Sequence, residues 1–132
     1  MIMEENSKEI VISKDSLVID IQSEFTSFYP FLKIEFLTKA KKYFSFRNNK
    51  VNPESKISKI TDSTFPVKLD VGPERTIVEI EEDCQALLGL TMQVSRKSGN
   101  VWNAISLTDN WTLRSQNEAA EFICTEMAPA LG

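Results

Sequence analysis

The residues best suited to binding lie in the last third of the chain, where two tryptophans stand among amides, cations and a carboxylate. Exposed indole rings supply a large apolar area, and polar neighbours supply directional hydrogen bonds, a common composition for a binding surface. A helix beginning near Thr112 would also favour an anion at its N-terminus. The candidate binding residues are Arg96, Lys97, Asn100, Trp102, Asp109, Trp111 and Gln116.

The same segment also has a purely structural interpretation, and we keep both open. Residues 97–100 are typical of a hairpin turn, and residues 108–112 are typical of an Asx-turn that caps a helix. Trp102 alternates with Ala104 and could equally face the core. The exposure of the two tryptophans therefore decides between the interpretations.

A second candidate is the basic segment of residues 39–50, in which aromatic side chains alternate with cations. Stacking aromatics and phosphate-seeking cations on a strand are typical of sheets that bind single-stranded nucleic acid. Alternation also fits Phe44 and Phe46 facing a core, and the overall pI of about 4.9 argues against nucleic acid. The candidate nucleic-acid contacts are Lys39, Lys41, Lys42, Tyr43 and Arg47.

A third candidate is the acidic run of Glu79, Glu81, Glu82 and Asp83. Paired carboxylates can hold a divalent ion or exchange protons, but this needs groups from several elements and partial burial. All four belong to one predicted helix, on the side opposite its apolar stripe. We therefore expect a solvated face.

The chain contains no histidine, which removes the usual general base and the commonest metal ligand. Cys84 and Cys124 lack metal-site spacing, so we expect buried free thiols. No phosphate-binding loop or nucleophile motif takes their place. The sequence thus predicts no catalytic residues, no cofactor and no metal ion.

Length and composition predict one soluble cytoplasmic domain over residues 1–132, with residues 1–8 flexible. No stretch is long and apolar enough to cross a membrane, and the first residues lack the pattern of an export signal. The net charge of −4 hides an asymmetry, because residues 37–59 carry seven basic residues and one glutamate. Such a split favours an anionic partner or self-association.

The hydrophobic periods predict the elements that must position these residues. Helices are expected after Asp15, from Thr76 through a Thr76–Glu79 capping box to Gly89, and after Thr112. A weak helical turn is expected within residues 53–61. The expected strands cover residues 10–12, 31–36, 43–47, 66–71, 90–94 and 101–105.

The order of these elements indicates an internal repeat of residues 9–61 and 66–127. The apolar triplet Leu32, Ile34 and Phe36 falls where Leu90, Met92 and Val94 fall. The predicted fold is α+β, with a mixed, mostly antiparallel sheet, helices on one face, and a duplicated βαββα, ferredoxin-like unit. Two small sheets packed across a pseudo-twofold axis remain the alternative.

The second half resembles a pattern found in small uncharacterised bacterial proteins. The residues that carry the resemblance are 76–81, 88–94, the Arg96–Trp102 stretch RKSGNVW, and the Thr108–Asn117 stretch TDNWTLRSQN. Together with residues 16–36, the resemblance covers about two thirds of the chain. No activity is assigned to that family, so the resemblance implies kinship without a mechanism.

We therefore rank three hypotheses. The first is a non-enzymatic module that binds a protein partner or a second copy of itself through a sheet edge or the tryptophan-bearing surface. The second is single-stranded nucleic-acid binding through residues 39–50, and the third is an enzyme that uses carboxylates or a lysine. The first rests on the missing catalytic residues and on the opposed charge segments.

Overall fold

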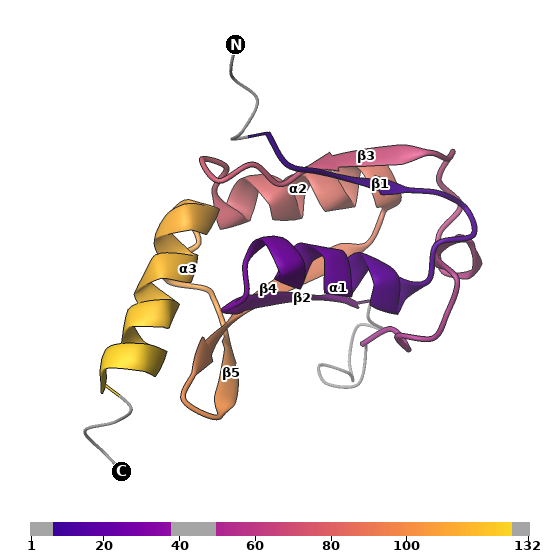
Figure 1. Cartoon of the computed structure of the whole chain (residues 1–132). Helices are drawn as coiled ribbons and strands as arrows, with labels where there is room; N and C mark the ends of the chain where they lie inside the picture. The colour runs from indigo at the N-terminus through magenta and orange to yellow at the C-terminus, as the bar shows by residue number, and fades with distance from the viewer. Residues whose placement is uncertain (1–6, 38–49, 128–132) are drawn as a thin grey trace, which may run out of the picture.

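The computed structural model describes residues 7–37 and 50–127, and in it five antiparallel strands form two small sheets (Figure 1). Strands β1 (Glu9–Ile12) and β3 (Val67–Asp70) pair as a two-stranded ribbon. Strands β2 (Leu32–Leu37), β4 (Thr91–Ser98) and β5 (Val101–Ala104) form a second sheet in the order β2-β4-β5. The strands agree closely with the expected ranges, apart from a longer β4.

The predicted α+β class is confirmed, but the prediction of one mixed sheet was wrong. Alternation shows which side of a strand is buried and does not show which strand it pairs with. A ferredoxin-like core also needs parallel neighbours, whereas every pairing among the described strands is antiparallel. The alternative of two small sheets is the arrangement found.

Helices α1 (Val18–Phe28) and α2 (Ile77–Leu88) lie between the ribbon and the three-stranded sheet (Figure 1). Helix α1 contacts β1 and β2, and helix α2 contacts β3 and β4. One cluster of buried apolar side chains joins both helices to both sheets. None of the described helices is long and apolar enough to cross a membrane.

The start and the end of α2 follow its sequence closely. Thr76 Oγ1 accepts the backbone N–H of Glu79, and a Glu79 carboxylate oxygen accepts that of Thr76, which completes the expected capping box. Gly89 ends the helix with a φ of 68°, a left-handed conformation that glycine adopts without a steric penalty.

Helix α3 (Leu113–Phe122) packs across one end of the three-stranded sheet and continues as a π-turn over Ile123–Met127. Thr112 caps it by accepting the backbone N–H of Ser115 at 3.1 Å, as expected. Asn117 Oδ1 accepts the backbone N–H of Phe31 at 2.8 Å, which ties the helix to the start of β2. In this way α3 fixes the end of the sheet where the candidate residues lie.

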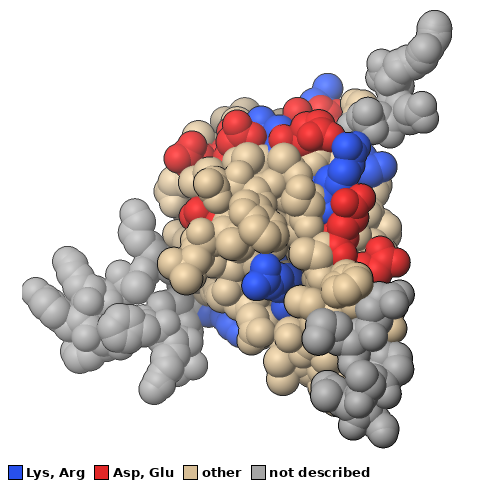
Figure 2. Space-filling model, turned by 90° about the vertical axis from the view of Figure 1, so that its left-hand side faces the viewer, with Lys and Arg blue, Asp and Glu red and all other residues tan. Residues whose placement is uncertain are grey.

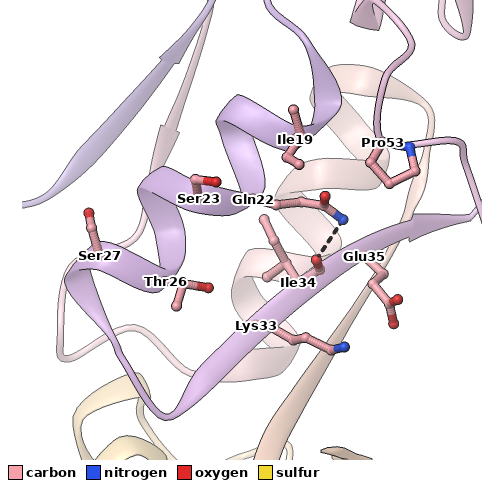
Figure 3. A pocket seen from close by; sticks show the side chains of 9 residues that line it. All are labelled: Ile19, Gln22, Ser23, Thr26, Ser27, Lys33, Ile34, Glu35 and Pro53. Atoms are coloured by element: carbon pink, nitrogen blue, oxygen red, sulfur yellow. Dashed lines mark hydrogen bonds between the residues drawn. The ribbon is translucent and has the colours of Figure 1, made fainter.

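Side chains of α1 close the outer edge of β2. Thr26 donates to the Leu32 carbonyl at 3.1 Å, and Gln22 donates to the Ile34 carbonyl at 3.0 Å (Figure 3). The next outward carbonyl, that of Phe36, accepts the backbone N–H of Val51 at 2.9 Å. We call this the closed edge, because another strand could bond to these carbonyls only by displacing the present donors.

The backbone contacts of the two halves correspond. Val18 N–H bonds to Ser55 O as Ile77 N–H bonds to Trp111 O. Two further pairs of hydrogen bonds repeat the pattern. The bond from Ile57 N–H to Ser16 O corresponds to that from Leu113 N–H to Arg75 O, and the bond from Val51 N–H to Phe36 O corresponds to that from Ile105 N–H to Val94 O. These contacts agree with a duplication, although the duplication itself stays a prediction.

The strand registers can be compared with the predicted internal repeat. Ile10 faces Leu69 in the ribbon, and Glu35 faces Gln93 in the larger sheet. In the predicted repeat, each pair would join residues at equivalent positions of the two halves. The registers therefore agree with the repeat, and a pseudo-twofold relation between the halves stays a prediction.

Candidate functional site

Arg96 and Gln116 belong to a structural network. Arg96 Nη1 donates to Gln116 Oε1 at 3.1 Å, and Gln116 Nε2 donates to both the carbonyl and the hydroxyl of Thr108 at 2.7 Å. Gln116 is fully buried. These groups hold α3 against β4 and against the loop between β5 and α3. Because these polar groups already bond to one another, they serve the fold.

Lys97 and Trp102 face each other across the β4–β5 ladder, on the side of the sheet away from the helices. Trp102 is partly buried, and Lys33 Nζ lies 5.0 Å from the centroid of its ring. Such a cation–π contact stabilises the hairpin and occupies one face of the indole. Trp102 is thus neither a core residue nor a free aromatic surface.

Trp111 lies elsewhere, in the loop between β5 and α3. Its carbonyl accepts the backbone N–H of Ile77 at 3.2 Å, and its side chain is 42% exposed. Asn100 is exposed beside Gly99 in the hairpin turn. The residues selected from the sequence therefore divide between a buried network, the outer sheet face, the hairpin turn and this loop.

Glu81 departs from the expected solvated face. Burial raises the pKa of its carboxyl from the ordinary value of 4.5 to about 7, with a smaller rise from the charge of Asp109 and an opposing effect of a hydrogen bond with the Val94 backbone. Asp109 lies in the loop that bonds to α2, since its carbonyl accepts the Val78 N–H at 2.9 Å. The loop brings a second carboxylate close to Glu81. Burial also raises the pKa of the Cys84 thiol to about 12.

The raised pKa of Glu81 predicts a pH-dependent stability. Between about pH 4.5 and 7 the folded protein holds the Glu81 proton and the unfolded chain does not, so the free energy of unfolding falls as pH rises through this range. We expect Glu81→Gln to stabilise the protein at pH 8 by about 1–2 kcal/mol, after allowance for solvent screening. Urea unfolding at pH 5 and pH 8 measures the effect.

Glu82→Gln is the matched control, because Glu82 is the exposed neighbour on the same helix. Glu82→Gln should leave the difference in the free energy of unfolding between pH 5 and pH 8 as it is in the parent protein. Equal pH responses of the parent and Glu81→Gln would show that Glu81 is not the group responsible.

A shallow cavity of about 630 Å³ lies between α1 and β2 (Figure 3). Gln22, Thr26 and Ser27 line it, and each donates its side-chain hydrogen bond to a backbone carbonyl. Lys33 lies over Trp102, and Glu35 forms an ion pair with Lys50 at 3.3 Å. Because these groups are engaged within the fold, the cavity has no positioned pair for acid–base chemistry.

The described part of the chain contains no group of three or more Cys, Asp or Glu side chains that could hold a metal ion. Cys84 is buried, as expected, while Cys124 is only partly buried and lies 3.6 Å from the Lys97 carbonyl oxygen through its thiol. The predicted strand over residues 43–47 lies outside the described residues. So do the candidate nucleic-acid contacts Lys39, Lys41, Lys42, Tyr43 and Arg47.

The outer edge of β5 is a candidate that was not predicted from the sequence. Ile105 N–H bonds to the Val94 carbonyl, so the alternation of an antiparallel ladder turns the N–H and C=O groups of Trp102 and Ala104 away from β4. No described strand pairs with them. The run from Ser98 to Thr108 contains no charged residue, and that signal was available in the sequence.

Exposed apolar side chains lie on β5 and in the loop that follows it. Val101 on β5 is 55% exposed, Leu107 in the loop is 94% exposed, and Trp111, farther along the same loop, is 42% exposed. In Figure 2, the face that carries α3 and the β4–β5 hairpin is mostly uncharged, with basic side chains just below its centre, and acidic side chains lie along its upper and right-hand borders. The edge and its apolar neighbours together form the strongest candidate for a functional surface.

The chain matches no protein-family model, no curated protein and no solved structure. The resemblance to a bacterial family therefore stays a prediction.

Proposed function

We propose that the protein is a non-enzymatic interaction module that receives a partner's strand on the outer edge of β5. The observation that carries the proposal is the outward orientation of the Trp102 and Ala104 backbone groups, with no described strand beside them. An added strand would bond to this edge through its main chain, and the neighbouring side chains would set its specificity.

The other strand edges support the choice of β5, because each has a feature that opposes the addition of a strand. The closed edge of β2 has its outward carbonyls occupied by Gln22, Thr26 and Val51. The ribbon carries exposed charges at Glu9 on β1 and at Lys68 and Asp70 on β3. Charged side chains on an edge discourage strand addition, and β5 has neither a charge nor a proline.

The two alternative functions have less support in the described residues. The candidate nucleic-acid contacts of residues 39–50 lie almost wholly outside the described residues, so that alternative stays a prediction. Gln22, Thr26 and Glu35, which line the cavity between α1 and β2, bond to backbone carbonyls or to Lys50, which argues against acid–base chemistry in this cavity.

The duplicated unit predicted from the sequence belongs to the same proposal. Where the second half continues into α3, the corresponding part of the first half forms only the 3-10 helix Ile57–Lys59. In this interpretation the first half mainly completes the scaffold. The second half, with its longer helix and its open hairpin edge, carries the interaction surface.

Site-specific photo-crosslinking tests the proposed surface. A photoreactive amino acid at Val101 should crosslink to a protein in cells, whereas the same group at Val11 should not. The two positions are matched, because both are strand valines with exposures of 55% and 54%. The Val101 product should be lost in Ala104→Pro, which removes an outward N–H and leaves the ladder to β4 intact.

Ala104→Ser is the control for this substitution, because it keeps the N–H group and a small side chain. It should retain the crosslinked product. Equal products at Val101 and Val11, or a Val101 product that survives Ala104→Pro, would overturn the proposed surface.

A further inference from the structure

The outward groups of β5 restrict the registers in which it can pair with a copy of itself. Two antiparallel β5 strands exchange hydrogen bonds only where outward-facing residues oppose each other. Pairing Trp102 with Ala104 of the copy, and Ala104 with Trp102 of the copy, uses all the outward groups of Val101–Ala104. Asn103 then faces Asn103 of the copy, on the twofold axis.

The side chains of β5 fit this register. Trp102 and Ala104 both point to the sheet face away from the helices, so the large indole of one strand lies beside the small methyl group of the other. If the copy were shifted by two residues, Trp102 would face Trp102 of the copy, and the two indoles would be crowded together at the axis. Along β5 the residues are a large aromatic, an amide and a small alanine. An antiparallel copy presents them in the opposite order, so each large side chain meets a small one.

The surrounding charges also permit the pairing. Across the outer face, the row of opposed residues would read Lys33, Ser95 and Ala104, followed by Trp102 and Lys97 of the copy. The lysines are separated by uncharged residues, and no like charges lie directly opposite each other. The two amides at the axis are able to bond to each other, because each carries a donor and an acceptor.

We infer that the partner strand is β5 of a second copy of the chain, which gives a twofold dimer with one continuous six-stranded sheet. This inference rests on the proposed function, since it names the occupant of the same edge. The paired strands are short, so the dimer should dissociate on dilution, and its uncharged contact should make it insensitive to salt.

The axis position gives a direct test of the register. In a non-hydrogen-bonded antiparallel pair the Cα atoms lie about 4.5 Å apart, within the range of about 4.4–6.8 Å that a disulfide spans. In a Cys124→Ser background, Asn103→Cys should therefore form an intermolecular disulfide under mild oxidation. Ser106→Cys is the control, because this exposed position lies outside the strand and far from its own copy.

Sedimentation of the purified full chain complements the disulfide test. The parent protein and Ala104→Ser should form the dimer, while Ala104→Pro should raise its dissociation constant by about thirtyfold, from the loss of one N–H donor per copy. Adding Ala104→Pro to Asn103→Cys should abolish the disulfide.

Absence of the Asn103→Cys disulfide, or equal crosslinking of Ser106→Cys, would overturn the inference. If the Val101 photo-crosslink then joined a protein of another mass and still depended on Ala104, the proposed function would stand with a different partner. Loss of both signals would remove the inference and the proposed function together.

Discussion

Replacing Phe25 by alanine should lower the free energy of unfolding by about 3–5 kcal/mol, the usual cost of deleting a buried aromatic side chain. Phe25 is fully buried on α1, which contacts a strand of each sheet, and its ring centroid lies 5.4 Å from that of Tyr29. The cavity left by the ring would remove contacts between α1 and the common core. Urea unfolding followed by circular dichroism measures the loss.

Phe28→Ala is the matched control for this prediction. Phe28 belongs to the same helix, but it is only partly buried, with Lys8 Nζ 5.4 Å from its ring centroid. Phe28→Ala should lower the free energy of unfolding by about 1–2 kcal/mol, because less apolar area is removed from the interior. A smaller loss for Phe25→Ala than for Phe28→Ala would mean that the centre of the core is misplaced.

Gln116→Ala should be the second most damaging change, at about 2–4 kcal/mol, because it leaves buried polar groups without partners. The side chain bonds to Arg96 and twice to Thr108, and alanine replaces none of these contacts. The loop that carries Trp111 should loosen with it. A shift in tryptophan fluorescence below the unfolding transition would report this local change.

Glu118→Ala is the control, since Glu118 is exposed on the same helix, and it should change stability by no more than about 0.5 kcal/mol. If Gln116 were instead a binding residue with little structural role, Gln116→Ala would leave stability and fluorescence unchanged. That outcome would support Gln116 as a binding residue, as predicted from the sequence.

The helices could be predicted from the sequence because their signals are local. The Thr76–Glu79 capping box and Gly89 define α2 within a few residues, and the spacing of Val18, Ile21 and Phe25 defines the buried side of α1. The division of the strands into two sheets depends on contacts between distant segments. Alternation carries no information on those contacts, so the sheet order could not be predicted.

The candidate site was harder to predict, because burial of a polar residue depends on what packs over it. Gln116 falls at a helical spacing from Leu113 and Ala120, and that position on the apolar stripe was a sign of burial. Glu81 similarly lies one turn from Ile77, on the side of α2 that the loop before α3 covers. In both cases the pattern contained the signal, but the amide and the carboxylate were interpreted as surface groups.

The closed edge of β2 sets a limit on how far any assembly can grow. A sheet with two open edges can add strands at both ends without limit, which leads to fibres. Here Gln22 and Thr26 occupy carbonyls at one edge of the sheet, and at the other edge no described strand pairs with β5. If two copies join at β5 as proposed, the closed edge of β2 would lie at both outer ends of the joined sheet. The Thr26 hydroxyl and the Gln22 amide would then prevent further strands from adding, so the assembly would stop at two copies.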